Sequence, residues 1–141
     1  MKAKRYVKPA SDARHRNWQM LLYPESCCED WKEFLIECGL SWIASPLHDK
    51  DLNEDGTLKK PHYHLYLSYD GKKSYRQVLE TVAEPIQAVF PDIENVVVIH
   101  NMKAAICYLT HDGFNDKAQY SQALIQKSVF HRSFMILFIE A

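Results

Sequence analysis

The sequence predicts an α+β domain of the ferredoxin-like, split βαβ type, in which helices flank a central antiparallel sheet. Two observations carry this prediction. The hydrophobic patterns follow one another in the order strand, helix, strand, strand, helix, strand, helix. The chain has 141 residues, of which 47% are hydrophobic and 25% charged, a composition typical of one globular domain with a core of its own.

The first predicted elements are a strand and a helix, separated by a proline. Residues 17–23 (NWQMLLY) form a short apolar run rich in strand formers, which Pro24 ends. Residues 26–29 (SCCE) have the S-x-x-E form of a capping box, after which apolar residues recur at helical spacing until Gly39. We therefore expect the helix over roughly residues 28–38.

Two further strands are expected on either side of a polar loop. Residues 42–45 read as a strand that Pro46 closes. Residues 47–60 form a charged loop that contains the turn signal Asp55-Gly56. The alternating segment 62–68 (HYHLYLS) predicts the next strand.

The second half of the chain contains two helical patterns and the plainest strand. The pattern becomes helical from Ser74, and Pro85 must kink or end that helix. Residues 96–99 (VVVI) predict a fourth strand. Residues 102–109 (MKAAICYL) return to a helical pattern, which stops near Gly113.

The chain divides into a basic arm over residues 1–16, one domain over 17–126 and an atypical apolar tail over 127–141. Three interpretations of the tail stay open: a final strand, part of an interface, or the stub of a truncated or frame-shifted protein. No apolar stretch approaches the roughly 18–20 residues that cross a bilayer, and no apolar segment follows the arm as in a signal peptide. The four cysteines form no C-x-x-C pair. We therefore expect a soluble, cytoplasmic protein without a disulfide framework or a membrane partner.

The charge distribution is more informative than the net charge. A net charge of −1 and a pI near 6.6 do not by themselves indicate a nucleic-acid binder. Outside the arm, however, basic residues form clusters that could follow a phosphate backbone: Lys59 and Lys60, then Lys72, Lys73 and Arg76. Each cluster taken alone is explained equally well as a solvated surface.

The motif HYH at residues 62–64 lies on a predicted strand. Residues two apart project from the same face, about 6.5–7 Å apart along the chain, so two imidazoles can close on one metal ion. Alone, H-x-H more often marks a histidine pair in a core or on an edge strand. In the preceding loop, His48 and Asp51 can supply further ligands, with Asp49 as the second-choice carboxylate.

Three imidazoles and one carboxylate would form a mixed nitrogen and oxygen site. Such ligation suits Mn, Mg or another first-row divalent ion, and the lack of paired cysteines argues against structural zinc. HDKD at residues 48–51 is, on its own, typical of a solvated turn with a local salt bridge. Its combination with the HYH motif favours a metal site.

Tyr108 falls within the last predicted helix, which follows a strand of the same sheet and could lay the hydroxyl beside the metal. With a pKa near 10, only about a thousandth of a tyrosine is ionised at neutral pH. Attack on phosphorus therefore needs a metal that polarises the phosphodiester. The chain has eight tyrosines, so packing of the helix on the sheet is the alternative role of Tyr108.

At these places the sequence resembles the HUH endonucleases, and closely the replication initiators of small bacterial rolling-circle plasmids. The family pattern reads here as LLYPES at 21–26, ASPLHDKD at 44–51, HYH within 61–65 after a basic linker, and YLTH at 108–111. Order and spacing agree across roughly residues 17–112. Beyond about residue 126 nothing matches the oligomerisation segment that the family commonly adds.

The resemblance implies that His48, Asp51, His62 and His64 hold a divalent cation, Mn or Mg, and that Tyr108 is the single nucleophile. It implies a 5′-phosphotyrosyl link, a free 3′-hydroxyl that primes the host polymerase, and later strand transfer. The expected partners are double-stranded origin repeats, a single-stranded or hairpin nick site, host replication proteins and further copies of the chain.

Several residues have weaker assignments within this resemblance. Lys103 lies five residues before Tyr108 on the same helix, where it either touches a phosphate or is simply solvated. His100 and His111 are assigned structural roles, with His111 near the helix end.

Three alternatives to the nicking function stay open. The first is a truncated, non-catalytic origin-binding module that represses replication, and the second is a structural domain with a coincidental H-x-H. The third is a mobilisation relaxase, which shares the chemistry but acts in conjugative transfer. The short chain and the ASPLHDKD form favour the replication initiator.

Overall fold

The computed structural model describes residues 13–87 and 96–128. Its sheet has five strands in the order β4-β1-β3-β2-β5, and every neighbouring pair is antiparallel. The strands are β1 (Arg14–Leu22), β2 (Ser41–Ala44), β3 (Tyr63–Ser74), β4 (Val97–Val98) and β5 (Gln126–Lys127). The predicted α+β class with a central antiparallel sheet is confirmed.

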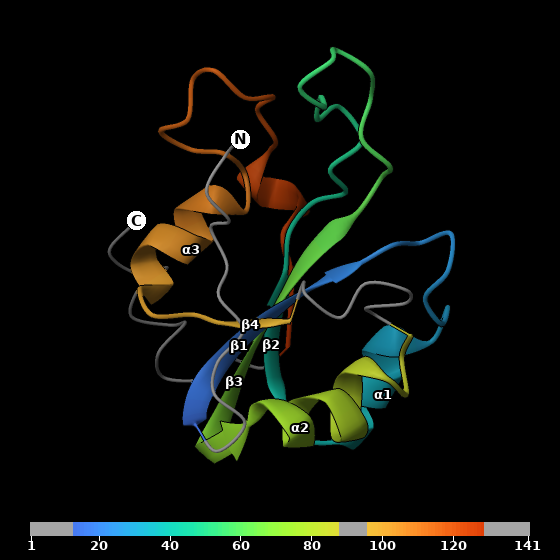
Figure 1. Ribbon diagram of the computed structural model, residues 1–141, viewed down its shortest axis with the longest axis vertical. Helices are drawn as coiled ribbons and strands as arrows, with labels where there is room; N and C mark the ends of the chain where they lie inside the picture. Colours follow the sequence, from blue (N-terminus) through green and yellow to red (C-terminus); the bar gives the residue numbers. More distant parts are fainter. Residues whose placement is uncertain (1–12, 88–95, 129–141) are drawn as a thin grey trace.

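Helices cover both faces of this sheet. They are α1 (Trp31–Glu37), α2 (Tyr75–Val78) with the π-helical turn η1 (Leu79–Ala83), α3 (Met102–Tyr108) and the 3-10 turn η3 (Gln122–Leu124). Figure 1 shows α1 and α2 together on one side of the sheet and α3 on the other side. None of the helices within the described ranges is both long and apolar enough to span a membrane.

Strand alternation divides the core into two clusters. The larger one, on the α1 and α2 face, includes Leu65 and Leu67 of β3. Tyr66 points to the opposite face, where it packs with Ile43 and Leu109, and its hydroxyl donates a 2.6 Å hydrogen bond to the carbonyl of Ala105. This contact holds α3 over the first half of β3, where the His64 ring near the start of β3 contacts Tyr108 at the end of α3.

The predicted capping box over residues 26–29 is wrong. The N–H groups of Ser26 and Cys27 both donate to the carbonyl of Tyr23, so this segment forms a turn after the first strand. Helix α1 begins only at Trp31, and its N-cap Asp30 makes no side-chain capping bond. Local turn hydrogen bonds compete here with helix formation.

A complete capping box forms instead at the start of α2. The Ser74 hydroxyl accepts from the N–H of Gln77, and the Gln77 side chain accepts from the N–H of Ser74. The helical segment ends at Ala83, before Pro85, as predicted. Strand β1 begins earlier than expected and β3 continues to Ser74, whereas the apolar tail from residue 129 onward lies outside the described residues.

Candidate metal centre and tyrosine

Backbone pairing brings the two histidine motifs together at the start of β3. His48 and His62 form an isolated bridge, in which each N–H donates to the other's carbonyl at 2.8 and 3.2 Å. The N–H of His64 donates to the hydroxyl of Ser45 at 2.9 Å. The loop after β2 is thereby fastened against the strand that carries the HYH motif.

Three imidazoles converge at this point. His48, His62 and His64 each offer one nitrogen, and these nitrogens lie within 4.8 Å of one another. The ring centres are 5.3 Å apart for His48 and His62, 4.7 Å for His48 and His64, and 5.1 Å for His62 and His64. All three residues are buried, with at most 6% of their surface exposed.

Asp51 adds a carboxylate to the group. Its Oδ2 lies 3.2 Å from Nδ1 of His48 and 3.5 Å from Nε2 of His62. Asp49, the second-choice ligand, is exposed, and it belongs to neither cluster of candidate ligands found in the described residues. The structure therefore brings the four residues into one cluster, in which Asp51 contacts His48 and His62 and the ring of His64 lies against both of these rings.

Hydrogen bonds to backbone carbonyls determine where the ring protons lie. His48 donates from Nε2 to Leu109 at 2.7 Å, and His62 donates from Nδ1 to Lys60 at 2.9 Å. Because a carbonyl can only accept, the lone pair of each neutral ring lies on the other nitrogen, which faces Asp51. Two lone pairs and a carboxylate repel one another unless a proton or a cation lies between them.

The electrostatics of the site favour neutral imidazoles and an ionised carboxylate. Burial lowers the pKa of His48 and of His62, and it places the pKa of His64 well below its usual value, with a further contribution from the neighbouring histidines. Burial opposes ionisation of Asp51, but a hydrogen bond from Tyr120 and the nearby histidines outweigh it and lower its pKa. This donor set fits a divalent cation. The buried imidazoles do not readily take up protons, and a cation would supply the positive charge that balances the carboxylate.

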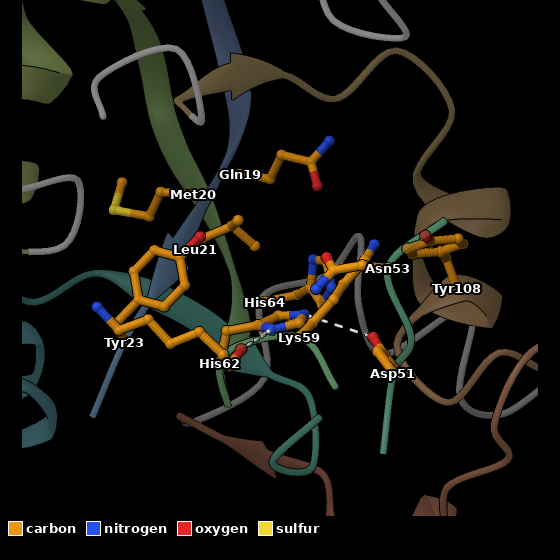
Figure 2. Close-up of a pocket in the computed structure, with 11 residues that line it drawn as sticks. Gln19, Met20, Leu21, Tyr23, Asp51, Asn53, Lys59, His62, His64 and Tyr108 are labelled. Carbon is orange, nitrogen blue, oxygen red and sulfur yellow. Dashed lines mark hydrogen bonds and ion pairs between the residues drawn. The ribbon is translucent and has the colours of Figure 1, made fainter. Parts of the chain in front are cut away.

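Tyr108 is the last residue of α3 and borders the same centre. Its ring lies edge to face with His64 at 5.6 Å and with His111 at 4.9 Å. Together with His62, His64 and Asp51 it lines a pocket of about 420 Å³. Figure 2 shows Tyr108 and Tyr23 on opposite sides of the histidines, so the pocket extends past the cluster in both directions.

Only one of the predicted basic clusters lies at this pocket. Lys59 and Lys60 line it, and the Lys60 ammonium lies 4.8 Å from the centre of the Tyr23 ring. Lys72 and Lys73 belong to the far end of β3, where Lys73 pairs with His15 of β1, whereas His64 pairs with Leu21, six residues and roughly 20 Å further along β1.

The other two predicted DNA contacts also lie away from the pocket lining. Arg76 on α2 pairs with Glu80 at 3.9 Å on the surface. Lys103 is exposed in the first turn of α3. The structure does not bring either side chain to the pocket, and their contacts with DNA stay predictions.

Sequence patterns missed two residues of the centre. His111, expected to be structural, forms a second candidate ligand group with His48 and Asp51. Its Nδ1 donates to Ala118 at 2.7 Å, whereas its buried Nε2 has no hydrogen-bond partner in the described part of the chain. The sequence signal that could have indicated His111 as part of the centre is its place in the YLTH motif, three residues after Tyr108.

Tyr120 is the second missed residue, and no motif pointed to it. Its hydroxyl donates a 2.6 Å hydrogen bond to Oδ1 of Asp51, and its ring stacks on His48. Burial and the contact with Asp51 raise the pKa of Tyr120 above its usual value, so the phenol stays protonated. Lys117 is a further neighbour, with its ammonium 6.0 Å from the centre of the Tyr108 ring.

Residues 10–131 match the family model described as plasmid replication protein, origin binding domain. The chain belongs to this family. It is 42% identical to a replication protein RepB of Lactiplantibacillus plantarum over 113 residues, which cover 80% of this chain and 48% of the relative. It is 37% identical to a Staphylococcus aureus replication protein over 111 residues, which cover 79% of this chain and 53% of the relative. This origin-binding domain thus spans about half the length of the curated relatives that it matches.

Proposed function

We propose that this domain nicks one strand of a plasmid origin to start rolling-circle replication, through metal-assisted attack of Tyr108 on the scissile phosphate. The observation that carries the proposal is the cluster of three buried imidazoles and a carboxylate beside a pocket that His62, His64, Asp51 and Tyr108 line. Membership of the origin-binding family and the similarity to replication proteins support a role at a plasmid replication origin.

The metal would be held by His48, Asp51, His62 and His64. Three imidazoles match Mn²⁺ better than Mg²⁺, which prefers carboxylates and water, although both are candidates. When bound, the cation polarises the phosphodiester and offsets the charge that develops on its oxygens. The hydrogen bonds to the carbonyls of Leu109 and Lys60 would keep the lone pairs of His48 and His62 available as ligands, on the ring nitrogens that face Asp51.

The reaction would begin with the Tyr108 hydroxyl. Its oxygen forms a bond to phosphorus and loses its proton to solvent, while the bond from phosphorus to the 3′ oxygen breaks. That oxygen takes up a proton and becomes the free 3′-hydroxyl, and the downstream strand stays linked through a 5′-phosphotyrosine. In a later strand transfer, a 3′-hydroxyl attacks this link and releases the tyrosine.

The expected partners follow from this chemistry. Lys59 and Lys60 at the pocket would hold phosphates that flank the nick in a single-stranded or hairpin site. Double-stranded origin repeats, the host proteins that extend the 3′-hydroxyl, and other copies of the chain complete the proposal, all in the host cytoplasm.

A module that only binds DNA is the main alternative, and a mobilisation relaxase would share the chemistry. Nothing in phosphate binding alone requires buried imidazoles that face a carboxylate, so the site favours catalysis.

Incubation of the purified chain with labelled, hairpin-forming origin oligonucleotides tests the proposal. We expect shorter labelled fragments on denaturing gels with Mn²⁺ or Mg²⁺ and none with EDTA. Tight binding without cleavage under every metal would instead establish the non-catalytic module.

A further inference from the structure

Tyr120 contacts the candidate metal centre through both its hydroxyl and its ring. The hydroxyl donates to Oδ1 of Asp51 at 2.6 Å and accepts from the N–H of Lys50 at 3.1 Å. The ring lies parallel to that of His48, with an interplanar angle of 3° and a centre-to-centre distance of 4.3 Å. One side chain therefore touches two of the proposed ligands.

We propose that Tyr120 is a positioning residue that restricts Asp51 to one coordinating oxygen, and that it thereby selects Mn²⁺ or Mg²⁺ over the larger Ca²⁺. This inference rests on the metal-binding part of the proposed function.

The carboxylate of Asp51 has two differently engaged oxygens. Oδ1 is held by the Tyr120 hydroxyl, with Nδ1 of His111 3.9 Å away. Oδ2 faces the nitrogens of His48 and His62 at 3.2 and 3.5 Å. Oδ2 is therefore the oxygen that faces the imidazole nitrogens of His48 and His62, whereas Oδ1 accepts the short hydrogen bond from Tyr120.

The segment after α3 holds Tyr120 in this position. The backbone N–H of Tyr120 donates to the carbonyl of Thr110 at 3.2 Å, and Thr110 lies directly beyond the helix that carries Tyr108. The segment then returns to the sheet edge, where β5 pairs with β2. Backbone contacts and the stacking on His48 thus hold the phenol in place, and its hydroxyl is fixed within hydrogen-bonding distance of the Asp51 carboxylate.

One-oxygen coordination discriminates between cations of different size. Ca²⁺ takes six to eight oxygen ligands at about 2.3–2.6 Å and commonly uses both oxygens of a carboxylate. Mg²⁺ requires near-octahedral geometry at about 2.0–2.1 Å, and Mn²⁺ also suits octahedral sites. A carboxylate restrained through Oδ1 serves the small octahedral ions and denies Ca²⁺ a chelating ligand.

The variant Tyr120→Phe removes the hydroxyl and keeps the stacking ring. Binding is measured without DNA, by titrating Mn²⁺ into the chain and following free Mn²⁺ by electron paramagnetic resonance, with Ca²⁺ as competitor. We expect the Kd for Mn²⁺ to rise by about 10- to 100-fold, the range typical when a group that orients a ligand is removed. We also expect Ca²⁺ to displace Mn²⁺ from the variant at a lower ratio of Ca²⁺ to Mn²⁺ concentration than from the unchanged chain.

A matched control and an internal reference keep the test decisive. Tyr63→Phe removes a hydroxyl on the opposite face of β3, where Tyr63 packs beside Trp31, and should leave both quantities unchanged. Comparing the melting temperature of each variant with and without Mn²⁺ separates metal affinity from any change in stability.

Each outcome bears on a distinct claim. Unchanged Mn²⁺ affinity and unchanged Ca²⁺ competition in Tyr120→Phe would overturn the inference and leave the proposed nicking function standing. Weakened Mn²⁺ binding with an unchanged ratio of Ca²⁺ to Mn²⁺ affinity would overturn the selectivity. An unchanged chain that binds no Mn²⁺ would overturn both the inference and the metal-assisted mechanism.

Discussion

The Nε2 of His48 donates a 2.7 Å hydrogen bond to the backbone oxygen of Leu109, the residue that directly follows Tyr108. This bond joins positions 61 residues apart in the sequence. It ties a proposed metal ligand to the end of the helix that carries the proposed nucleophile, and it leaves Nδ1 of His48 facing Asp51. One hydrogen bond therefore connects the proposed ligand to the helix of the proposed nucleophile, and substitutions can test each of the two roles separately.

Replacing Tyr108 by phenylalanine removes only the proposed nucleophilic oxygen. We expect the variant to bind origin DNA as the unchanged chain does in a mobility-shift assay, and to show no cleavage on denaturing gels. Tyr63→Phe, on the other face of the sheet, should cleave normally. Cleavage by Tyr108→Phe at the unchanged rate would assign the nucleophile to another residue.

His64→Ala removes a buried imidazole from the metal centre. The unchanged chain should gain about 2.7 kcal/mol of stability at a Mn²⁺ concentration 100 times its Kd. The variant should gain little or nothing and should lose metal-stimulated cleavage. Denaturant unfolding of each protein with Mn²⁺ and with EDTA measures this difference, and any cavity that the substitution leaves affects both conditions alike. An equal gain in the variant would remove His64 from the ligand set.

The two lysine clusters should differ in their effect on single-stranded DNA. Lys59→Ala with Lys60→Ala should weaken binding of the nick-site oligonucleotide and reduce the slope of log K against log salt by about 0.7 for each phosphate that a lysine no longer neutralises. Lys72→Ala with Lys73→Ala, at the far end of β3, is the matched control and should change the slope less. The reverse ranking would place the single strand away from the pocket.

Acid should destabilise the metal-free protein within a defined window. An unfolded histidine has a pKa of about 6.5, and burial lowers the pKa of His48, His62 and His64 below it in the folded chain. The unfolded chain therefore takes up protons first as the pH falls, so the free energy of unfolding should decrease from about pH 7 through the lowered histidine pKa values. Urea unfolding in EDTA at about pH 7, 6 and 5 measures this decrease. A constant value would contradict the described environment of the histidines.

The order of elements could be predicted from the sequence because strand and helix periodicities are local properties. The start of α1 could not, because the N–H of Ser26 takes part in a turn with Tyr23 that the S-x-x-E pattern does not reveal. The clustering of the four proposed ligands could be predicted because they fall in two short motifs of distinctive residue types; their role as ligands stays a prediction. Tyr120 was missed because its hydrogen bond to Asp51 spans 69 residues and depends on the path of the segment after α3.

The central claim is tested most directly by mapping a covalent adduct. The purified chain is incubated with an origin hairpin oligonucleotide in Mn²⁺ or in EDTA, digested with protease, and analysed by mass spectrometry for peptides that carry a nucleotide. We predict a Mn²⁺-dependent adduct joined through a 5′ phosphate to Tyr108, with a free 3′-hydroxyl on the released fragment. Cleavage with no protein-linked product, or an adduct on a different residue, would contradict the proposed mechanism.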